Sequence, residues 1–283
     1  MYHTTGLSEE DIRELAVLVA EECKDKPGHC WPPSVGLLNS IVITLTYARR
    51  NRVQAEIAEA FNVSQPTVSR AISRLTPVLA KVLADRVPVA DDLDMRQQYI
   101  IDGTLLPCWS WADHPDLYSG KHKTTGLNVQ VACDLTGRLA WVSDPVPGAR
   151  HDVAALRMSG ILDADAPQPV DRRQRLPRIR HDPANPQTRL PQPPRLGKKL
   201  NTAVNRIRWR IEQTIANLKT WRVLHTDYRR PLDTFATTIS AVLGLESSGW
   251  RVNKPHWLGC GLPYLHCKNW MAFCVTSPAL AER

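Results

Sequence analysis

The spacing of apolar residues changes near Leu83, and this change constrains the fold more than any other feature of the chain. Before Leu83 the apolar residues recur at the period of an amphipathic helix. After it they come in short runs separated by turn-forming residues, as in strands. A chain of 283 residues can form two domains that each bury a core. The sequence therefore predicts an α+β protein, with an all-α domain first and a sheet domain second.

Two helices are expected before residue 51, after a flexible start. Ser8 can cap the first helix, and the acidic residues 9–11 suit its positive end. This helix should stop before Pro27. The second helix is predicted from Ser34 to Arg50, because apolar residues repeat there at helical spacing, and it ends in a basic run.

Residues 53–75, VQAEIAEAFNVSQPTVSRAISRL, predict a helix-turn-helix. The first helix would turn Ile57 and Ala58 inward, and the small Ala58 allows a second helix to cross closely. A tight turn near Asn62 leads to the second helix, which Ser64 can cap. Pro66 lies in the first turn of that helix, where a missing N–H breaks no hydrogen bond.

The second helix of this motif has one apolar face and one polar face. Val68, Ile72 and Leu75 share the apolar face. The polar surface carries groups that can reach base edges and phosphates in a major groove. An ordinary helical hairpin with a polar outer face is the alternative. The predicted DNA-binding residues are Gln65, Thr67, Ser69, Arg70 and Arg74.

The chain is basic, with 36 Lys and Arg against 28 Asp and Glu, a net charge of +8 and a pI near 9.3. This charge favours nucleic acid over a neutral small molecule as partner, although a protein that is merely basic would show it too. No apolar run reaches membrane-spanning length and no export signal opens the chain, so we expect a cytoplasmic, nucleoid-associated protein. The seven cysteines lack paired spacings and are expected to be free thiols. A possible zinc cluster near the C-terminus has a spacing that matches no common zinc-finger pattern; its residues are Cys260, His266, Cys267 and Cys274.

Beyond Leu83, residues 97–104 predict a buried strand that ends in an acid, Asp102. Residues 127–134 and 138–144 should form an antiparallel pair across a tight turn. A helix follows from about Val153 to Met158, with Asp152 as its cap. This order of three strands and a helix is how a ribonuclease H-like domain begins. We expect the Asp102 carboxylate at the sheet edge; a plain turn after a strand is the alternative.

Residues 205–224, NRIRWRIEQTIANLKTWRVL, predict a helix with three charged side chains near one face. Glu212 follows Arg208 by four residues, and Lys219 follows Glu212 by seven, which places all three near one face. A solvated amphipathic helix is the alternative. The buried stripe is marked by Ile207, Ile211, Ile215 and Leu218.

This segment resembles the signature of DDE transposases of insertion-sequence family five and their Harbinger-like relatives. That signature is an aromatic residue, two residues, Arg, three residues, Glu, six residues and Lys; Asn205 stands in place of the aromatic. The resemblance extends over about residues 8–166 and 198–245, and includes the DGT at 102–104 and the PGARHD at 147–152. It implies that Asp102 and Glu212 are the first and last metal-binding acids of a ribonuclease H-like, mixed-sheet catalytic domain.

The resemblance also implies an activity and a domain division. Residues 1–90 would form the helix-turn-helix domain and residues 95–245 the DDE domain, with residues 246–283 unassigned. Two divalent ions, Mg or Mn, would support hydrolysis at transposon ends and then strand transfer. Lys219 or Arg208 would steady phosphate charge. Expected partners are double-stranded DNA, both transposon ends and target, and further copies of the chain.

One catalytic acid of the family pattern is missing. It belongs in a Gly-Asp-x-Gly-Tyr motif, but residues 168–195 instead contain seven prolines and seven arginines. VDRRQRLPR can be encoded so that the next reading frame gives WIGDNGYP. We therefore hypothesise that compensating frameshifts near Pro169 and Lys198 disrupted the domain over 168–197 and weakened or abolished catalysis.

Several alternatives to this hypothesis stay open. The irregular region could be a genuine basic, proline-rich insert that contacts DNA. Asp171 and Asp182 lie in it, but neither has a strand to aim it. Asp152 could replace the missing metal ligand, although a capping or supporting role is favoured. A DNA-binding protein or repressor without chemistry, using residues 34–80, and a metal-dependent nuclease of the same fold are the alternative functions.

Overall fold

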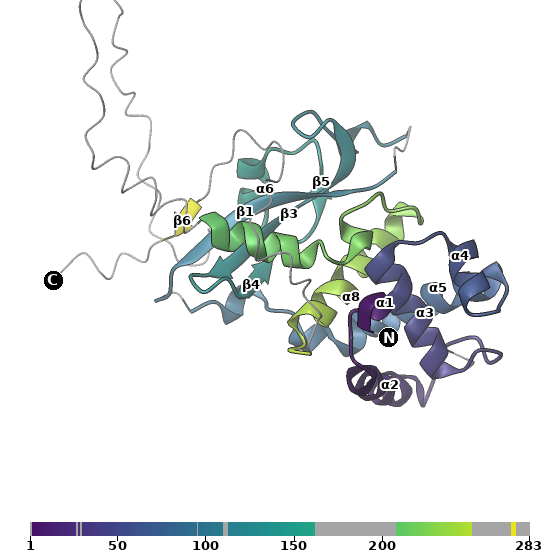
Figure 1. Ribbon diagram of the computed structural model, residues 1–283. Coiled ribbons are helices and arrows are strands. Elements are labelled where there is room, and N and C mark those ends of the chain that lie inside the picture. Colours follow the sequence, from purple (N-terminus) through teal and green to yellow (C-terminus); the bar gives the residue numbers. More distant parts are fainter. Residues whose placement is uncertain are drawn as a thin grey trace, which may run out of the picture.

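The computed structural model describes residues 2–26, 28, 30–94, 96–109, 113–161, 208–250 and 273–275. A helical N-terminal region packs against an antiparallel sheet that carries helices on both faces (Figure 1). The predicted α+β class, with the helical region first, is confirmed. Asn205, Ile207, Asp171, Asp182 and the irregular 168–197 region lie outside the described residues, as do Cys260, His266 and Cys267. Among the described helices, none is long and apolar enough to cross a membrane.

The helical region begins with a well-packed segment instead of the flexible start that we predicted. Thr5 and Leu7 are fully buried, and the short first helix packs on the third. Ser8 caps the second helix as predicted: its hydroxyl accepts the Asp11 N–H at 3.0 Å, and the Asp11 carboxylate accepts the Ser8 N–H at 3.1 Å. The helices are α1 (Tyr2–Thr5), α2 (Glu9–Cys23), α3 (Leu37–Arg50), α4 (Gln54–Ala60) and α5 (Gln65–Val82), followed by the 3-10 turns η1 (Ala84–Arg86) and η2 (Ala90–Asp92).

Helix α3 starts at Leu37, three residues after the predicted start at Ser34. Gly36 precedes it with a φ of +77°, a backbone conformation that favours glycine and cannot continue into a helix. From Ser40 to Arg49 every residue of α3 is buried, including Arg49 of the predicted basic run, whereas Arg50 is exposed. The helix ends at Asn51 in the left-handed region, at a φ of +47°.

The predicted helix-turn-helix is present as α4 and α5. Ile57 and Ala58 are buried, and the turn passes through Asn62 at a φ of +50°. Ser64 is the N-cap residue of α5, but its hydroxyl bonds the Thr67 hydroxyl at 2.9 Å and not a backbone N–H. Val68, Ile72 and Leu75 are buried, as predicted.

The sheet is built on β1 (Tyr99–Pro107) and β3 (Thr124–Asp134), which pair antiparallel over nine positions, from Tyr99 with Asp134 to Pro107 with Gly126. Every strand ladder of the described residues is antiparallel, so the mixed character that we predicted is not seen in them. The order is β2-β3-β1-β6, and β4 and β5 also pair with β3. The remaining strands are β2 (Tyr118–Ser119), β4 (Leu139–Val142), β5 (Val146–Pro147) and β6 (Phe273–Val275).

The strand β6 comes from the C-terminal tail, to which the sequence assigned no structure. Its three residues pair with the start of β1, from Ile101 with Phe273 to Tyr99 with Val275. The predicted turn between β3 and β4 is present: the Gly137 N–H donates to the Asp134 carbonyl at 3.0 Å. Residues 273–275 therefore extend the sheet beside β1.

The two faces of the sheet carry different helices. Because side chains alternate along a strand, Ile100 and Leu106 lie on one face of β1 and Ile101 on the other. The first face shares its core with the helical residues 208–218, drawn in green in Figure 1, and the second with Leu156 of α6 (Asp152–Met158). The even-numbered Asp102 therefore points to the face that the 208–218 helix covers.

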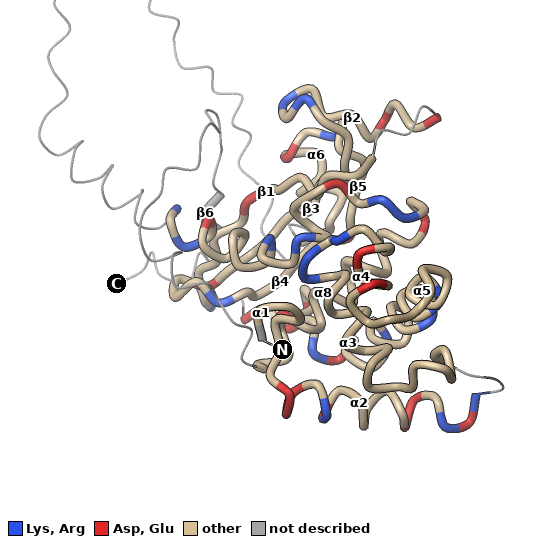
Figure 2. Tube along the Cα trace, turned by 45° about the vertical axis from the view of Figure 1, so that its right-hand side comes forward, with Lys and Arg blue, Asp and Glu red and all other residues tan. Residues whose placement is uncertain are grey.

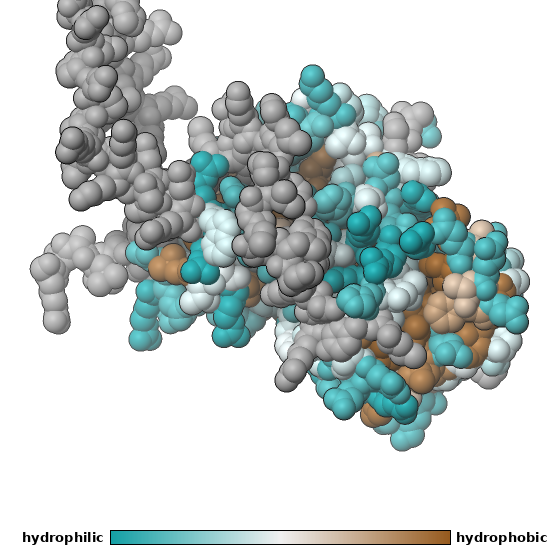
Figure 3. Space-filling view, viewed as in Figure 1, coloured by the Kyte–Doolittle hydropathy of each residue, from teal (hydrophilic) through white to brown (hydrophobic). Residues whose placement is uncertain are grey.

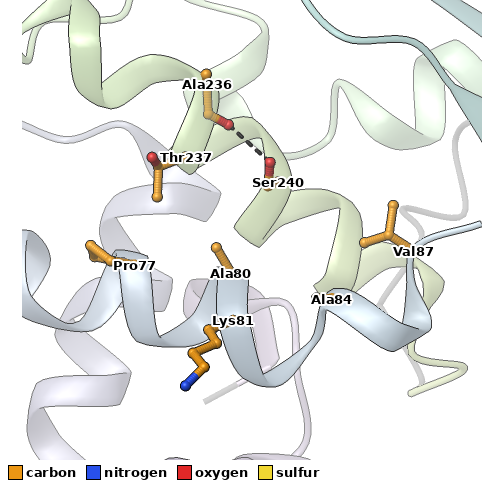
Figure 4. Close-up of a pocket in the computed structure, with 8 residues that line it drawn as sticks. All are labelled: Pro77, Ala80, Lys81, Ala84, Val87, Ala236, Thr237 and Ser240. Atoms are coloured by element: carbon orange, nitrogen blue, oxygen red, sulfur yellow. Dashed lines mark hydrogen bonds between the residues drawn. The ribbon is translucent and has the colours of Figure 1, made fainter. Parts of the chain in front are cut away.

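The helical region and the sheet share one hydrophobic core. After η4 (Arg222–Leu224) and η5 (Leu232–Thr234), helix α8 (Phe235–Ser247) packs along α5. Apolar side chains surface among the N-terminal helices in Figure 3, whereas the described surface between helices and sheet is largely hydrophilic. A hollow of about 550 Å³ lies between α5 and α8, lined by Pro77, Ala80 and Ser240 among others (Figure 4). It contains none of the predicted catalytic residues.

Helix α8 approaches the end of α5 closely at Gly244. A Cβ at this position would lie 2.4 Å from the Leu83 Cβ and 3.2 Å from the Leu83 carbonyl oxygen. Gly244→Ala should therefore lower the free energy of unfolding by about 1–3 kcal/mol, measured by urea denaturation. Gly120→Ala is the control, because no atom lies within 4 Å of a Cβ there. Equal stability of the two variants would contradict this packing.

Candidate active site and recognition helix

Asp102 lies in the middle of β1, opposite Val131 of β3, and not at the strand end that we predicted. The strand continues to Pro107 because the pairing with β3 continues. Asp102 is 8% exposed, and one of its carboxylate oxygens accepts a hydrogen bond from the Gly103 N–H at 2.9 Å. Burial raises the pKa of Asp102 to about 7; the charge of Asp152 also raises it, whereas the Gly103 hydrogen bond and the charges of Lys121 and Arg208 lower it.

The helix of residues 208–218 crosses the sheet on the Asp102 side. Ile211, Ile215 and Leu218 are buried, as predicted. The Thr214 hydroxyl donates to the Gly137 carbonyl at 2.9 Å and fixes the helix against the turn between β3 and β4. Glu212 is exposed, one turn after Arg208, and makes no hydrogen bond or ion pair with a described residue. The helix thus brings the Arg208 charge within reach of Asp102 and leaves Glu212 open to a ligand.

Asp152 occupies the opposite side of the sheet. His151 is the N-cap of α6 and Asp152 the first helical residue, so the predicted capping by Asp152 is wrong. One Asp152 oxygen accepts a hydrogen bond from the Lys121 ammonium at 2.7 Å, and the other accepts one from the Asn128 amide at 3.0 Å. Burial alone would raise the pKa of Asp152, but these two hydrogen bonds hold it below its ordinary value.

Gly103 permits this approach of Asp152. A Cβ at Gly103 would lie 2.8 Å from an Asp152 oxygen and 2.9 Å from the Gln130 side-chain nitrogen. The Gln130 amide in turn donates to Asn128 at 3.3 Å. Sequence reasoning missed this polar group, although the glycine that follows Asp102 and the acid of PGARHD were its signals.

The described residues contain no group of three or more His, Cys, Asp or Glu side chains placed to hold a metal ion. Asp102 nevertheless suits a hard cation, because it is a buried carboxylate with one hydrogen-bond donor in the described part of the chain. Glu212 is a second oxygen donor from the same side of the sheet. In the described residues, these two acids are not joined by a third His, Cys, Asp or Glu side chain in a group that could hold a metal ion.

The recognition helix α5 presents most of the predicted DNA-binding side chains. Gln65, Arg70 and Arg74 are exposed and Ser69 is half-buried. Thr67 is the exception, because it is 7% exposed and its hydroxyl contacts the Ser64 hydroxyl and the Arg70 guanidinium. Thr67 is thus buried at the start of the helix, where its hydroxyl is used within α5, and its contact with DNA stays a prediction.

Two family models match this arrangement. Residues 35–85 match the helix-turn-helix of DDE superfamily endonucleases, which contains α4 and α5. Residues 101–246, more than half of the chain, match the DDE superfamily endonuclease, which contains Asp102 and Glu212. The chain belongs to the DDE superfamily endonucleases. Membership implies DNA binding and cleavage, and endonucleases of this superfamily generally use divalent metal ions.

This DDE endonuclease is also similar to a curated protein. It is 29% identical over 229 residues to a protein named as a transposase for insertion sequence element IS112, from Streptomyces albus G. The match covers 78% of this chain and 83% of that protein. No solved structure matches the chain.

The burial of Asp102 makes the stability of this endonuclease depend on pH. Because the folded state raises the pKa of Asp102 to about 7, it binds the proton more tightly than the unfolded chain, where an Asp pKa is about 3.9. The protein should lose stability as pH rises from about 4 to about 7, by up to about 4 kcal/mol from this group. Asp102→Asn should abolish this loss.

The measurement is urea unfolding of both proteins in metal-free buffer at about pH 5 and about pH 8. The variant should be more stable than the wild type at the higher pH, with a smaller difference at the lower one. The same change with pH in both proteins would contradict the buried placement of Asp102.

Proposed function

We propose that this chain is a transposase of the insertion-sequence family five type. It binds transposon-end DNA through α4 and α5 and carries out cleavage and strand transfer on a ribonuclease H-like domain. One observation carries the proposal: Asp102 and the helix that bears Glu212 lie on the same side of the sheet. Both are in a chain of the DDE endonuclease superfamily that also has a helix-turn-helix. We propose residues 1–90 and 95–245 as the two functional domains, and no role for residues 246–283.

Asp102 and Glu212 are the residues that would hold Mg or Mn, two ions in the complete site. Bound there, divalent ions supply activation of the attacking oxygen and stabilisation of the leaving oxygen. The chain itself orients Asp102 through the Gly103 N–H and screens it from water under the 208–218 helix. Arg208 and Lys219 on that helix would bind the phosphate and steady its charge in the transition state. Water attacks first, and a DNA 3'-hydroxyl attacks in strand transfer.

On the DNA side, Arg70 and Arg74 would bind phosphates or guanine edges, with Gln65 and Ser69 beside them. The partners are double-stranded DNA at the transposon ends and at the target, and we propose a homo-oligomer that brings two ends together. We assign a positioning role to Asp152, because one of its oxygens is hydrogen-bonded to Lys121 and the other to Asn128.

A second candidate is a catalytically impaired copy that acts as a DNA-binding protein or repressor. Two observations favour it: the chain lacks the Gly-Asp-x-Gly-Tyr motif, and the described residues supply no third acid beside Asp102 and Glu212. Compensating frameshifts near Pro169 and Lys198 explain both. Codons 165–200 of the gene should therefore give Gly-Asp-x-Gly-Tyr one base later, and codons that do not give it would refute the frameshifts.

Cleavage of end-sequence DNA by the purified protein, with Mg or Mn, tests both candidates. We expect DNA binding with weak nicking, and Asp102→Asn or Glu212→Gln should reduce the nicking to background while binding persists. Glu10→Gln, an exposed acid of α2, is the control and should change neither. Robust nicking by the wild type would contradict impairment. Nicking that survives both active-site substitutions would contradict the assignment of these acids.

A further inference from the structure

A basic segment joins the two candidate functional elements. Residues 219–230, KTWRVLHTDYRR, lead directly from the end of the helix that bears Glu212 toward the recognition helix α5. They hold four Lys and Arg residues and one His against a single acid, Asp227. Lys and Arg positions gather between the sheet and the helical region in Figure 2. The side chains of Arg222, His225, Arg229 and Arg230 are here named the basic strip.

Hydrogen bonds attach this segment to two helices, to α5 through Ser73 and to the end of α3 through Asn51. The Arg230 guanidinium donates to the Ser73 hydroxyl of α5 at 2.8 Å. The Asn51 amide donates to the Thr226 hydroxyl at 2.7 Å and to the Asp227 carbonyl at 3.0 Å. Tyr228 is fully buried, with its ring stacked on Phe235 at 4.1 Å between centroids. The backbone that carries the basic strip is therefore anchored to α3, α5 and the buried core.

The Arg230 contact places the basic strip beside the DNA-reading surface of α5. Ser73 is exposed and lies three residues after Arg70, so the two share one face of the helix. Arg230 thus meets α5 on the face that carries a predicted DNA contact. At its other end the basic strip follows Lys219, whose charge also reaches His225.

The cations of the basic strip have few partners of opposite charge. Arg222, His225 and Arg229 are exposed. Arg222 and Arg229 have no side-chain hydrogen bond or ion pair with a described residue. Partial desolvation of the ring, and then the charges of Lys219 and Arg222, lower the pKa of His225. Like charges that are held close together without counter-charges destabilise the fold, unless an anion binds there.

We infer that the basic strip binds the phosphate backbone of duplex DNA, and that it extends the DNA contact of α5 along the same chain toward Asp102 and Glu212. Duplex DNA is the anion that fits, because its phosphates are regularly spaced along a line and arginine binds them bidentately. Such contacts carry no sequence information and position the duplex. This inference rests on the proposed function, which names DNA as the partner of α5.

The test is the binding of a short fluorescein-labelled duplex of arbitrary sequence to the full chain, measured by fluorescence anisotropy over a range of salt concentrations. The variant is Arg222→Gln with Arg229→Gln, two exposed residues whose loss should not lower the thermal midpoint, because it removes like charges that repel each other. The matched control is Arg13→Gln with Arg157→Gln, two exposed arginines on α2 and α6. A third variant, Arg70→Gln, reports on α5 alone.

Each lost phosphate contact should reduce the salt slope of log K by about 0.9, and the affinity by up to about tenfold at about 0.1 M salt. We expect this loss in the basic-strip variant and not in the control. If Arg70→Gln weakens binding but the basic-strip variant matches the wild type, the inference is overturned and the proposed function stands. An equal loss in the control also overturns the inference, since it would reflect net charge alone. If none of the variants weakens binding, both the inference and DNA binding through α5 fail.

Discussion

The structure depends on a buried cation, Arg49, where α3, the end of the 208–218 helix and α8 meet. The Arg49 guanidinium donates to the Thr220 hydroxyl and lies 5.3 Å from the centroid of the Trp221 ring. The indole N–H of Trp221 donates to Glu246 of α8 at 3.2 Å. Burial lowers the pKa of Arg49, and the charge of Glu246 opposes that effect. A buried arginine is tolerated only where such partners surround it, so α3, the 208–218 helix and α8 must meet here.

This junction determines where the functional side chains can be. The helix that bears Glu212 is fixed at its end by Thr220 and Trp221, and Thr214 fixes it over the Gly137 turn. Helix α8 in turn packs along the recognition helix α5, and Gly244 allows its close approach to Leu83. The DNA-reading face and the face with Asp102 are consequently parts of one packed body. The position of α5 relative to Asp102 is therefore fixed by packing.

Local patterns predicted the helical elements well, and the errors came from contacts between residues distant in sequence. The helix-turn-helix was predictable because Ile57, Val68 and Ile72 repeat at helical spacing. Asp102-Gly103 was interpreted as a strand end, because only the pairing with β3 shows that β1 continues. The burial of Arg49 within the predicted basic run was not foreseen, because its partner Thr220 is 171 residues away. No local pattern in the sequence indicates that β6 pairs with β1. The side of the sheet on which Asp152 lies is likewise set by tertiary packing and cannot be predicted from local sequence.

The central claim, that recognition helix and sheet form one body, is tested most directly by hydrogen exchange of backbone amides at increasing denaturant concentration. The account predicts that the slowest amides of α5 and of β1 and β3 exchange through the same opening, with one free energy and one denaturant dependence. Arg49→Met should lower that free energy for both elements together. Exchange of the α5 amides at a clearly lower free energy than those of β1 and β3, unaffected by Arg49→Met, would contradict the account.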